Sequence, residues 1–269
     1  MHTENQSMPA SPLRAVVSVV IPVKNDSAVL GRCLRALGAQ TRPADEIIVV
    51  DNGSSDDSVR TAEVAGATVI YCPEPGIPAA SSRGYDFATG DLIFRLDADC
   101  VPPESWIASS VNYFAHHTDV SALTGPARFI DGPAAMRAPL SAIYLSIYTL
   151  MTAPALGHRP LFGSNFAMRR EVWQSVRTSV HRDDPELHDD LDLSFHIGER
   201  HHVQYLKSEA MGMSMRPFRS MSSFRRRTYR GFRTVTVHWP RDFPPHRWFR
   251  IVTLQCRSLL ASLGLTHEH

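Results

Sequence analysis

Apolar runs alternate with helix-patterned segments over the first hundred residues, and this alternation leaves the chain few folds. Residues 16–23 form a continuous, β-branched apolar run, which is typical of a strand buried on both faces of a parallel sheet. Behind the helix-start signal at Asp26, four apolar side chains recur at helical spacing up to Leu37. Further strands are predicted at 46–50, 68–71 and 91–96, with helices between them. This order predicts an α/β fold with a Rossmann-like, mostly parallel central sheet flanked by helices.

The second half of the chain is less regular but still mixes helices and strands. Helices are predicted at 102–114, 170–176 and 189–197, strands at 120–123 and 203–206, and a turn at 162–165. Residues 1–14 are polar and are predicted to form a flexible tail. We therefore expect one large domain that follows the tail.

Composition and charge narrow the classes of function. At 269 residues with 43% apolar content, the chain can bury a large core. The net charge of +1 gives no overall attraction to nucleic acid, and no recognition motif is present, so a nucleic-acid partner is not expected. The four cysteines lack Cys-x-x-Cys spacing and no secretory signal is recognisable, so we expect reduced thiols in the cytoplasm.

Two carboxylates, Asp97 and Asp99, stand one residue apart at the end of the fourth predicted strand. Side chains at i and i+2 of an extended chain point the same way, so both can face one ligand. Carboxylates that close resist joint ionisation unless a cation or a shared proton intervenes. A divalent ion such as Mg²⁺ or Mn²⁺, bridging to a diphosphate, fits this pair. An isolated Asp-x-Asp is usually a solvated turn, so the assignment depends on the neighbouring motifs.

Several short sequence motifs follow one another along the chain in a characteristic order. Residues 17–25 read V-S-V-V-I-P-V-K-N, residues 46–56 read E-I-I-V-V-D-N-G-S-S-D, and residues 88–99 read A-T-G-D-L-I-F-R-L-D-A-D. Residues 163–170, G-S-N-F-A-M-R-R, and the acidic segment 189–193, D-D-L-D-L, follow downstream. Over roughly residues 15–200 the chain resembles the family-2 nucleotide-sugar glycosyltransferases of the GT-A fold. The resemblance implies a nucleotide-binding half at 15–100 and an acceptor half at 101–215, together one GT-A domain. A basic amphipathic region at 216–269 lies beyond the motifs.

The implied reaction is transfer of a sugar from a nucleoside diphosphate to an acceptor, with inversion at the anomeric carbon. Asp99, with Asp97 nearby, would hold a divalent cation that stabilises the leaving diphosphate. Asp51 would accept a hydrogen bond from a pyrimidine imide, which favours a UDP-sugar, while Pro22 and Asn25 would form the adjacent wall. The alternative for Asp51 is an Asx-turn or a helix cap.

The chain departs from the family pattern at residues 80–84. Ala-Ser-Ser-Arg-Gly stands where the family usually has A-R-N-x-G, so the arginine is displaced by two residues. Arg83 is the candidate to bind the donor from a different angle; otherwise base recognition differs. The serines at 81 and 82 keep open a rival interpretation, a non-catalytic sugar-nucleotide-binding or scaffold protein of the same fold. Donor hydrolysis with added Mn²⁺ would separate the two.

Inversion by single displacement needs a base that takes the proton of the acceptor hydroxyl. Asp190 is our candidate because it is second in the acidic pair that the family uses, and Asp189 and Asp192 are its competitors. Helix capping and compensation of the helix dipole account for some of these acids. Among the histidines, three are candidates to complete the metal shell, and none is assigned: His188, His196 and His238.

The C-terminal region carries seven arginines and no acid between Arg216 and Arg233. These arginines could hold the diphosphate or a membrane-surface phosphate such as that of a polyprenyl carrier. The alternative is a solvated basic helix whose aromatic residues pack inward. Those aromatic residues are Phe218, Phe224, Tyr229 and Phe232.

The uncharged stretch 138–157 is the nearest approach to a membrane span. Pro139 and Pro154 are expected to bracket a helix of about four turns, too short to cross a bilayer. Tyr144 and Tyr148 on that helix are predicted to lie in the headgroup layer. The competing arrangement buries one face of the helix against the sheet, formed by Leu140, Ile143, Ile147 and Leu150. We expect a cytoplasmic enzyme, peripheral at the inner face of the membrane, that acts on a glycan or polyprenyl-linked acceptor in cell-envelope or polysaccharide biosynthesis.

Overall fold

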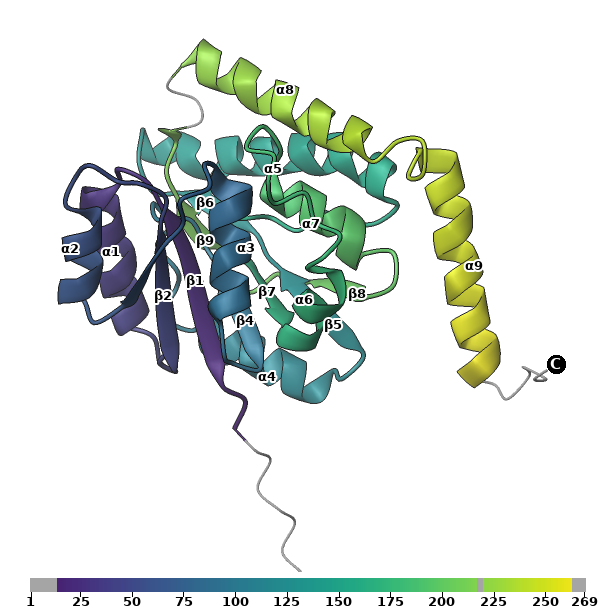
Figure 1. Ribbon diagram of the computed structural model, residues 1–269, viewed down its shortest axis with the longest axis horizontal. Helices are drawn as coiled ribbons and strands as arrows, with labels where there is room; N and C mark the ends of the chain where they lie inside the picture. Colours follow the sequence, from purple (N-terminus) through teal and green to yellow (C-terminus); the bar gives the residue numbers. More distant parts are fainter. Residues whose placement is uncertain (1–13, 217–219, 263–269) are drawn as a thin grey trace, which may run out of the picture.

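The computed structural model describes residues 14–216 and 220–262. The predicted tail at 1–14 lies almost wholly outside the described residues, as do Phe218 and Arg219 of the arginine-rich stretch. Figure 1 shows one sheet-and-helix body, with the last two helices over its top and along its side.

Seven strands form the central sheet in the order β3-β2-β1-β4-β7-β5-β8. β7 runs antiparallel to both of its neighbours, and the other pairings are parallel. The bounds are β1 Val17–Val23, β2 Glu46–Asp51, β3 Thr68–Tyr71, β4 Leu92–Arg95, β5 Val120–Thr124, β7 Phe166–Arg169 and β8 His202–Tyr205. The predicted α/β class and its mostly parallel sheet are confirmed. The carboxyl ends of β1, β2 and β4 meet at one edge, where such sheets bind ligands.

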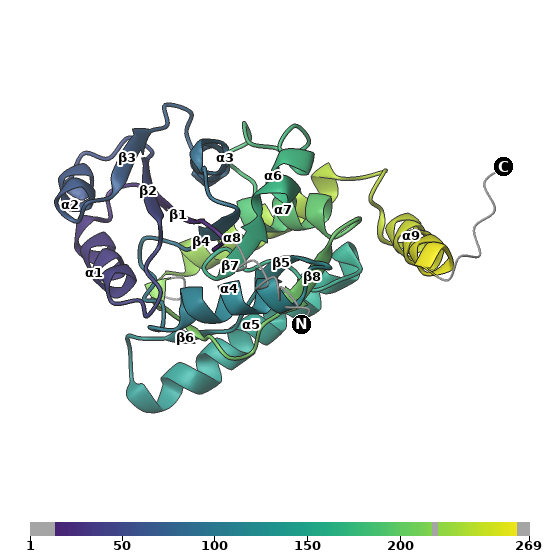
Figure 2. The same ribbon diagram turned by 90° about the horizontal axis from the view of Figure 1, so that it is seen from below.

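Helices cover both faces of the sheet (Figure 2). The helices on the two faces are α1 Ser27–Gly38, α2 Ser58–Val64, α3 Ile77–Phe87, α4 Trp106–His116, α6 Arg170–Val176 and α7 Asp189–Ile197. Alternate residues of β1 face opposite sides, as the twofold period of a strand requires. Val19 and Ile21 pack into a core that includes α1 and α4, whereas Val20 packs into a second core with α3, α6 and α7. Burial on both faces explains why the strand is apolar apart from Ser18, whose buried hydroxyl donates a hydrogen bond to Glu46.

A second sheet of two parallel strands, β6 Ala127–Phe129 and β9 Met211–Met213, was not predicted. Each strand has only three residues, too few for a periodic pattern to be recognised. Gly212 also pairs with Val101 in an isolated bridge. This small sheet leads the chain directly to Arg216, at the edge where the parallel strands end.

The long helix α5 spans Ala134–Leu156, and the prediction that two prolines bracket it is wrong. Pro139 and Pro154 both lie inside the helix. It ends instead at Gly157, whose φ of 78° is a left-handed conformation that glycine adopts without steric cost. Among the described residues, α5 is the one helix long and apolar enough to cross a membrane, which by itself is weak evidence for a span.

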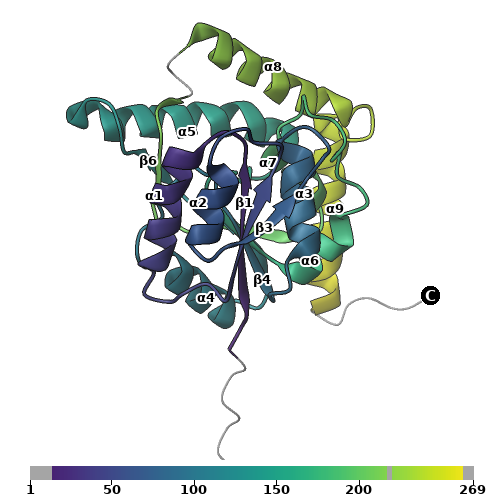
Figure 3. The ribbon, with the colours of Figure 1, turned by 60° about the vertical axis from the view of Figure 1, so that its left-hand side comes forward.

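Two helices form the C-terminal region, α8 Met221–Val237 and α9 Pro244–Ser262. Figures 1 and 3 show α5 and α8 at the end of the molecule toward which the parallel strands run, with α9 descending along one side. Ion pairs from Arg230 to Glu186 and from Arg233 to Asp184 attach α8 to the segment before α7.

The close packing of α3 on the sheet gives a testable expectation. A Cβ at Gly84 would lie 2.3 Å from Val20 Cγ1 and 2.9 Å from Val50 Cγ2, so Gly84→Ala should lower the free energy of unfolding by about 1–3 kcal/mol. Gly38→Ala, at a helical position with nothing within 4 Å, is the matched control and should be neutral or stabilising. Urea denaturation measures both; equal stability of the two variants would contradict this packing.

Candidate active site

An open cleft of about 670 Å³ lies at the carboxyl ends of β1 and β4. Its walls come from the loops after these strands, the start of α7, the inner side of α5 and the arginine-rich face of α8. Of the donor-binding, metal-binding and catalytic residues predicted from the sequence, those that line the cleft are Pro22, Asp97, Asp99 and Asp190. It also contains Arg95, which the sequence analysis had not singled out, together with arginines of the 216–233 stretch that were candidates to hold the diphosphate.

Arg95 is a buried cation at the base of the cleft, and its role was not foreseen. Its Nη2 atom lies 3.0 Å from Asp97 Oδ1 and 3.2 Å from Asp189 Oδ2, so one guanidinium joins the end of β4 to the start of α7. Burial opposes the charge, but Asp189 and Asp97 outweigh it and raise the pKa of Arg95. An arginine in an otherwise apolar strand was the sequence signal that could have identified it.

Asp97 and Asp99 experience opposite electrostatic environments. Burial disfavours the charge on Asp97, but Arg95 and a 2.6 Å hydrogen bond from Ser164 Oγ lower its pKa. Burial and the neighbouring Asp97 charge raise the pKa of Asp99, although the positive charge of Arg216 acts to lower it. The two carboxylates therefore form a like-charged pair in which only Asp97 is strongly stabilised as an anion.

Arg216 bridges two acids at the mouth of the cleft. Its Nη2 lies 2.8 Å from Asp99 Oδ2, and its Nη1 and Nη2 contact the carboxylate of Asp26. The unpredicted strand β9 delivers this arginine, so no local pattern could have paired it with Asp99. Asp26, predicted only as a helix start, also lines the cleft.

The two acids that begin α7 have different partners. Asp189 Oδ2 accepts a 2.9 Å hydrogen bond from Ser81 Oγ as well as the ion pair with Arg95. Asp190 Oδ2 accepts a 2.8 Å bond from the Gly163 backbone N–H, and Tyr148 Oη lies 3.5 Å away. Both acids line the cleft, but Asp189 is held by Arg95 and Ser81, whereas Asp190 is held by a backbone donor. Ser81, one of the two serines that depart from the family pattern, has a defined role in holding Asp189.

Close approach at Gly163 depends on the absence of a side chain. A Cβ there would lie 2.0 Å from Arg95 Nη1 and 2.9 Å from Asp190 Oδ2. The glycine therefore lets the backbone reach both the buried arginine and the candidate base.

Three predicted donor-binding residues do not line the cleft. Asp51 is buried and accepts a 3.0 Å hydrogen bond from the Ser54 N–H, which is the Asx-turn weighed as its alternative. Asn25, at φ 55°, accepts a 2.7 Å bond from the Ser55 N–H and so joins the loops after β1 and β2. Arg83 is exposed on α3, away from the cleft lining, and its position gives no support for donor contact.

The histidines proposed for the metal shell are separated. His188 lines the cleft, and its Nε2 lies 3.0 Å from the Arg227 carbonyl. His196 and His238 instead meet around Asp192, away from the cleft lining. Asp192 is therefore removed as a competitor for the role of base.

The arginine-rich helix α8 contributes directly to the cleft. Its cleft-lining members are Arg226, Arg227 and Arg230. The alternative in which the aromatic residues of α8 pack inward is wrong for the described ones, because Phe224, Tyr229 and Phe232 are exposed. Tyr144 and Tyr148 also line the cleft, which corrects their prediction as headgroup residues.

The comparisons agree with this architecture. The sequence profile of Glycosyl transferase family 2 matches residues 18–177, which is more than half of the chain, and the chain belongs to this family. Glycosyltransferase AglE of Haloferax volcanii is 34% identical over 104 residues, covering 36% of this chain and 34% of that protein. The undecaprenyl-phosphate 4-deoxy-4-formamido-L-arabinose transferase of Sodalis glossinidius is 37% identical over 114 residues, covering 39% and 35%. The chain thus spans about a third of the length of these curated relatives.

Two solved structures share the fold. The mannosyltransferase PcManGT from Pyrobaculum calidifontis, in complex with GDP-Man and Mn²⁺, has a TM-score of 0.64 at 18% identity, covering 96% of this chain and 77% of that one. Glucosyl-3-phosphoglycerate synthase from Mycobacterium tuberculosis, with Mn²⁺, UDP and glucosyl-3-phosphoglycerate, has a TM-score of 0.56 at 20% identity, covering 80% and 78%. At these identities the likeness establishes the GT-A fold.

The buried ion pairs of Arg95 yield a prediction for stability. Arg95→Met should cost about 2–4 kcal/mol at neutral pH, because it leaves two half-buried carboxylates, Asp97 and Asp189, without their buried cation. Arg95 lowers the folded-state pKa of Asp97, so this contribution is present above the ordinary carboxylate pKa and is lost as the pH falls through the lowered value.

Urea denaturation at neutral pH and near pH 3, below the ordinary carboxylate pKa of about 3.9, tests both parts. The stability gap between the native chain and Arg95→Met should narrow in acid, while Arg32→Met, on the exposed side of α1, should change little at either pH. A gap that is small at neutral pH, or that widens in acid, would contradict the assigned ion pairs.

Proposed function

We propose that this chain is an inverting, metal-dependent glycosyltransferase that moves a sugar from a nucleoside-diphosphate sugar to a glycan or polyprenyl-linked acceptor. One observation carries the proposal: the acidic pair Asp97 and Asp99 and the candidate base Asp190 line the same cleft. Family membership supports the transferase chemistry, and the structural relatives described with Mn²⁺ and nucleotide support the choice of cation and donor class.

The acidic pair fits a divalent cation. Ligand oxygens of Asp97 and Asp99 lie within 4.8 Å of each other, and hard oxygen donors are those that Mg²⁺ and Mn²⁺ prefer. The raised pKa of Asp99 reflects a like-charged neighbour, and a cation between the two groups would relieve this repulsion. When bound, the ion would neutralise the negative charge that develops on the leaving diphosphate. Arg216 would then turn from Asp99 toward a diphosphate oxygen.

The remaining steps belong to the protein side chains. The acceptor oxygen forms a bond to the anomeric carbon as the bond from that carbon to the diphosphate oxygen breaks. Asp190 takes the proton of the acceptor hydroxyl, oriented by the Gly163 N–H. Burial and the Asp190 charge raise the pKa of Tyr148, so its phenol stays protonated beside the base. The α8 arginines 226, 227 and 230 supply positive charge along the diphosphate path.

The donor is proposed to be a UDP-sugar. Pro22 lines the cleft, while Asn25 and Asp51 shape the two loops behind it. The Asx-turn with Ser54 uses Asp51 Oδ1, so in this proposal the nucleobase imide would donate to Oδ2. Arg83 is not needed, because Arg216 and the α8 arginines already line the cleft.

We place the enzyme at the cytoplasmic face of the membrane. The outer face of α5 is apolar and exposed, which overturns the arrangement that buries Ile143, Ile147 and Leu150 against the sheet. At the C-terminal end of α5, Trp248 of α9 donates a 2.8 Å hydrogen bond to the Pro154 carbonyl, and Phe249 of α9 is 75% exposed. An exposed apolar helix face, on a helix whose other side lines a cleft that also holds basic residues, suits the boundary layer of an anionic bilayer. The Sodalis glossinidius relative is named for an undecaprenyl-phosphate substrate, which supports a lipid-linked acceptor.

Loss of the metal ligand should abolish the metal effect. Asp99→Ala is expected to lower Mn²⁺-stimulated release of nucleoside diphosphate by about 10²–10³-fold, because the leaving group loses its compensating charge. Turnover is measured over a panel of donors with and without Mn²⁺. Asp57→Ala, an exposed acid before α2, is the control. Near-native Mn²⁺-dependent turnover in Asp99→Ala would remove the site assignment.

The base can be separated from the donor site by comparing transfer with binding. Asp190→Asn should cripple transfer to the acceptor while nucleotide affinity stays close to that of the native chain, since the lost group acts on the acceptor proton. Calorimetric titration with the nucleoside diphosphate and Mn²⁺ gives the affinity. A large loss of nucleotide binding would instead place Asp190 in the donor or metal site.

Membrane attachment is tested by co-sedimentation with anionic vesicles at low and high salt. We expect binding at low salt that weakens at high salt, because basic residues near an anionic surface each contribute about 1 kcal/mol. Ile147→Glu with Leu150→Glu should reduce binding. Val64→Glu, at an 82% exposed apolar position on α2, should not. Absence of vesicle binding even at low salt would leave a soluble acceptor as the better assignment.

A further inference from the structure

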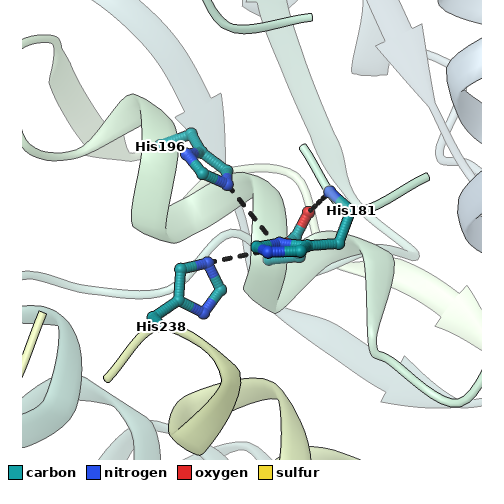
Figure 4. A group of neighbouring side chains, drawn as sticks. His181, His196 and His238 are labelled. Atoms are coloured by element: carbon teal, nitrogen blue, oxygen red, sulfur yellow. Dashed lines mark hydrogen bonds and ion pairs between the residues drawn. The ribbon is translucent and has the colours of Figure 1, made fainter. Parts of the chain in front are cut away.

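Three histidines and an aspartate converge outside the catalytic cleft. His181 lies in the segment between α6 and α7, Asp192 and His196 lie one turn apart on α7, and His238 follows the last residue of α8. Figure 4 shows the three imidazole rings directed toward one point. The cluster therefore joins α7 and the segment just before it to the end of α8, about forty residues further along the chain.

The distances in this cluster suit a small metal ion. From Asp192 Oδ1, the nearest ring nitrogens are 2.7 Å away in His181, 3.2 Å in His238 and 3.6 Å in His196. The four ligand atoms all lie within 4.8 Å of one another. Ligands at 2.0–2.1 Å from a tetrahedral Zn²⁺ would be separated by about 3.4 Å, which is within this range.

A hydrogen bond of His238 determines which of its two ring nitrogens carries the proton. The other nitrogen faces the cluster with a free lone pair. The Nδ1 of His238 lies 2.7 Å from the Thr234 carbonyl, which can only accept, so Nδ1 carries the proton. In the neutral ring Nε2 is then a bare lone pair aimed at a carboxylate oxygen, and the side chain is only 2% exposed. A backbone carbonyl on the far nitrogen is the arrangement that orients metal-ligating histidines.

Other atoms around the cluster are consistent with a cation at its centre. The Nε2 atoms of His196 and His238 are buried without a hydrogen-bond partner, an expensive state for buried polar atoms unless a ligand completes it. Asp192 Oδ2 is occupied by the His181 backbone N–H at 2.9 Å, which leaves Oδ1 directed into the cluster. The ring of His181 is partly exposed and provides an entry path.

We propose that His181, Asp192, His196 and His238 bind one structural Zn²⁺ ion. Three imidazoles and one carboxylate form a closed four-ligand set of the kind that Zn²⁺ favours, whereas Mg²⁺ and Mn²⁺ prefer the all-oxygen pair in the cleft. The ion fixes the end of α8 to α7. It thereby holds the cleft-lining arginines of α8 in place relative to Asp190 on α7. This inference is independent of the proposed reaction.

The test measures the zinc content of the protein under conditions that prevent zinc from binding in the cleft. Chain prepared without a histidine tag is stripped with a chelator, re-equilibrated with Zn²⁺ in excess Mg²⁺, dialysed and analysed by mass spectrometry of the metal. We expect about one Zn²⁺ per chain in the native protein and in Asp99→Ala. His238→Ala should retain less than about a tenth of that, since three ligands remain. His116→Ala, an exposed histidine on α4, should match the native chain.

Two further measurements keep the result interpretable if His238→Ala folds poorly. X-ray absorption at the zinc edge of the native protein should show four nitrogen or oxygen ligands near 2.0 Å and no sulfur. Zn²⁺ should raise the melting temperature of the stripped native chain and leave that of Asp192→Asn unchanged. The proposal fails if the native chain retains no zinc, if Asp99→Ala loses it while His238→Ala keeps it, or if sulfur ligands appear.

Discussion

The candidate site depends on the buried guanidinium of Arg95. It lies between a carboxylate at the end of β4 and one at the start of α7, segments almost a hundred residues apart. Two acids at that depth would repel each other and favour protonation, and the arginine makes their burial tolerable. Gly163 leaves the space that the guanidinium occupies, and Ser81 holds the second acid from α3. The positions of Asp97 and Asp190 therefore follow from one ion-pair network.

A second consequence of this network is the difference between the two members of the acidic pair. Asp97 is committed to Arg95 and Ser164, whereas Asp99 is paired with Arg216, which comes from a short edge strand and also contacts Asp26. Arg216 can exchange one anionic partner for another more readily than the buried Arg95 can. In the proposed mechanism, metal binding by Asp99 and its pairing with Arg216 are alternatives, and a bound diphosphate would favour metal binding.

The sequence predicted the parts of the fold that have a local signal. Residues 16–23 are apolar apart from Ser18 because β1 is buried on both faces, and the acids at the start of α7 mark that helix correctly. Prediction from the sequence failed where tertiary contacts determine the local structure. The prolines of α5 were expected to end the helix, and its tyrosines were expected to face lipid, yet Tyr144 and Tyr148 face the cleft. The His181 and His238 pairing around Asp192 spans two helices, so no motif spacing could reveal it.

The central claim is that Asp97 and Asp99 hold a divalent cation against a nucleoside diphosphate. The most direct measurement is a crystal structure of the chain with UDP and Mn²⁺, with anomalous scattering recorded at the manganese edge. The account predicts an anomalous peak between the two carboxylates and the diphosphate, with Arg216 turned away from Asp99. Bound UDP without a manganese peak at this pair, with Arg216 still on Asp99, would contradict it.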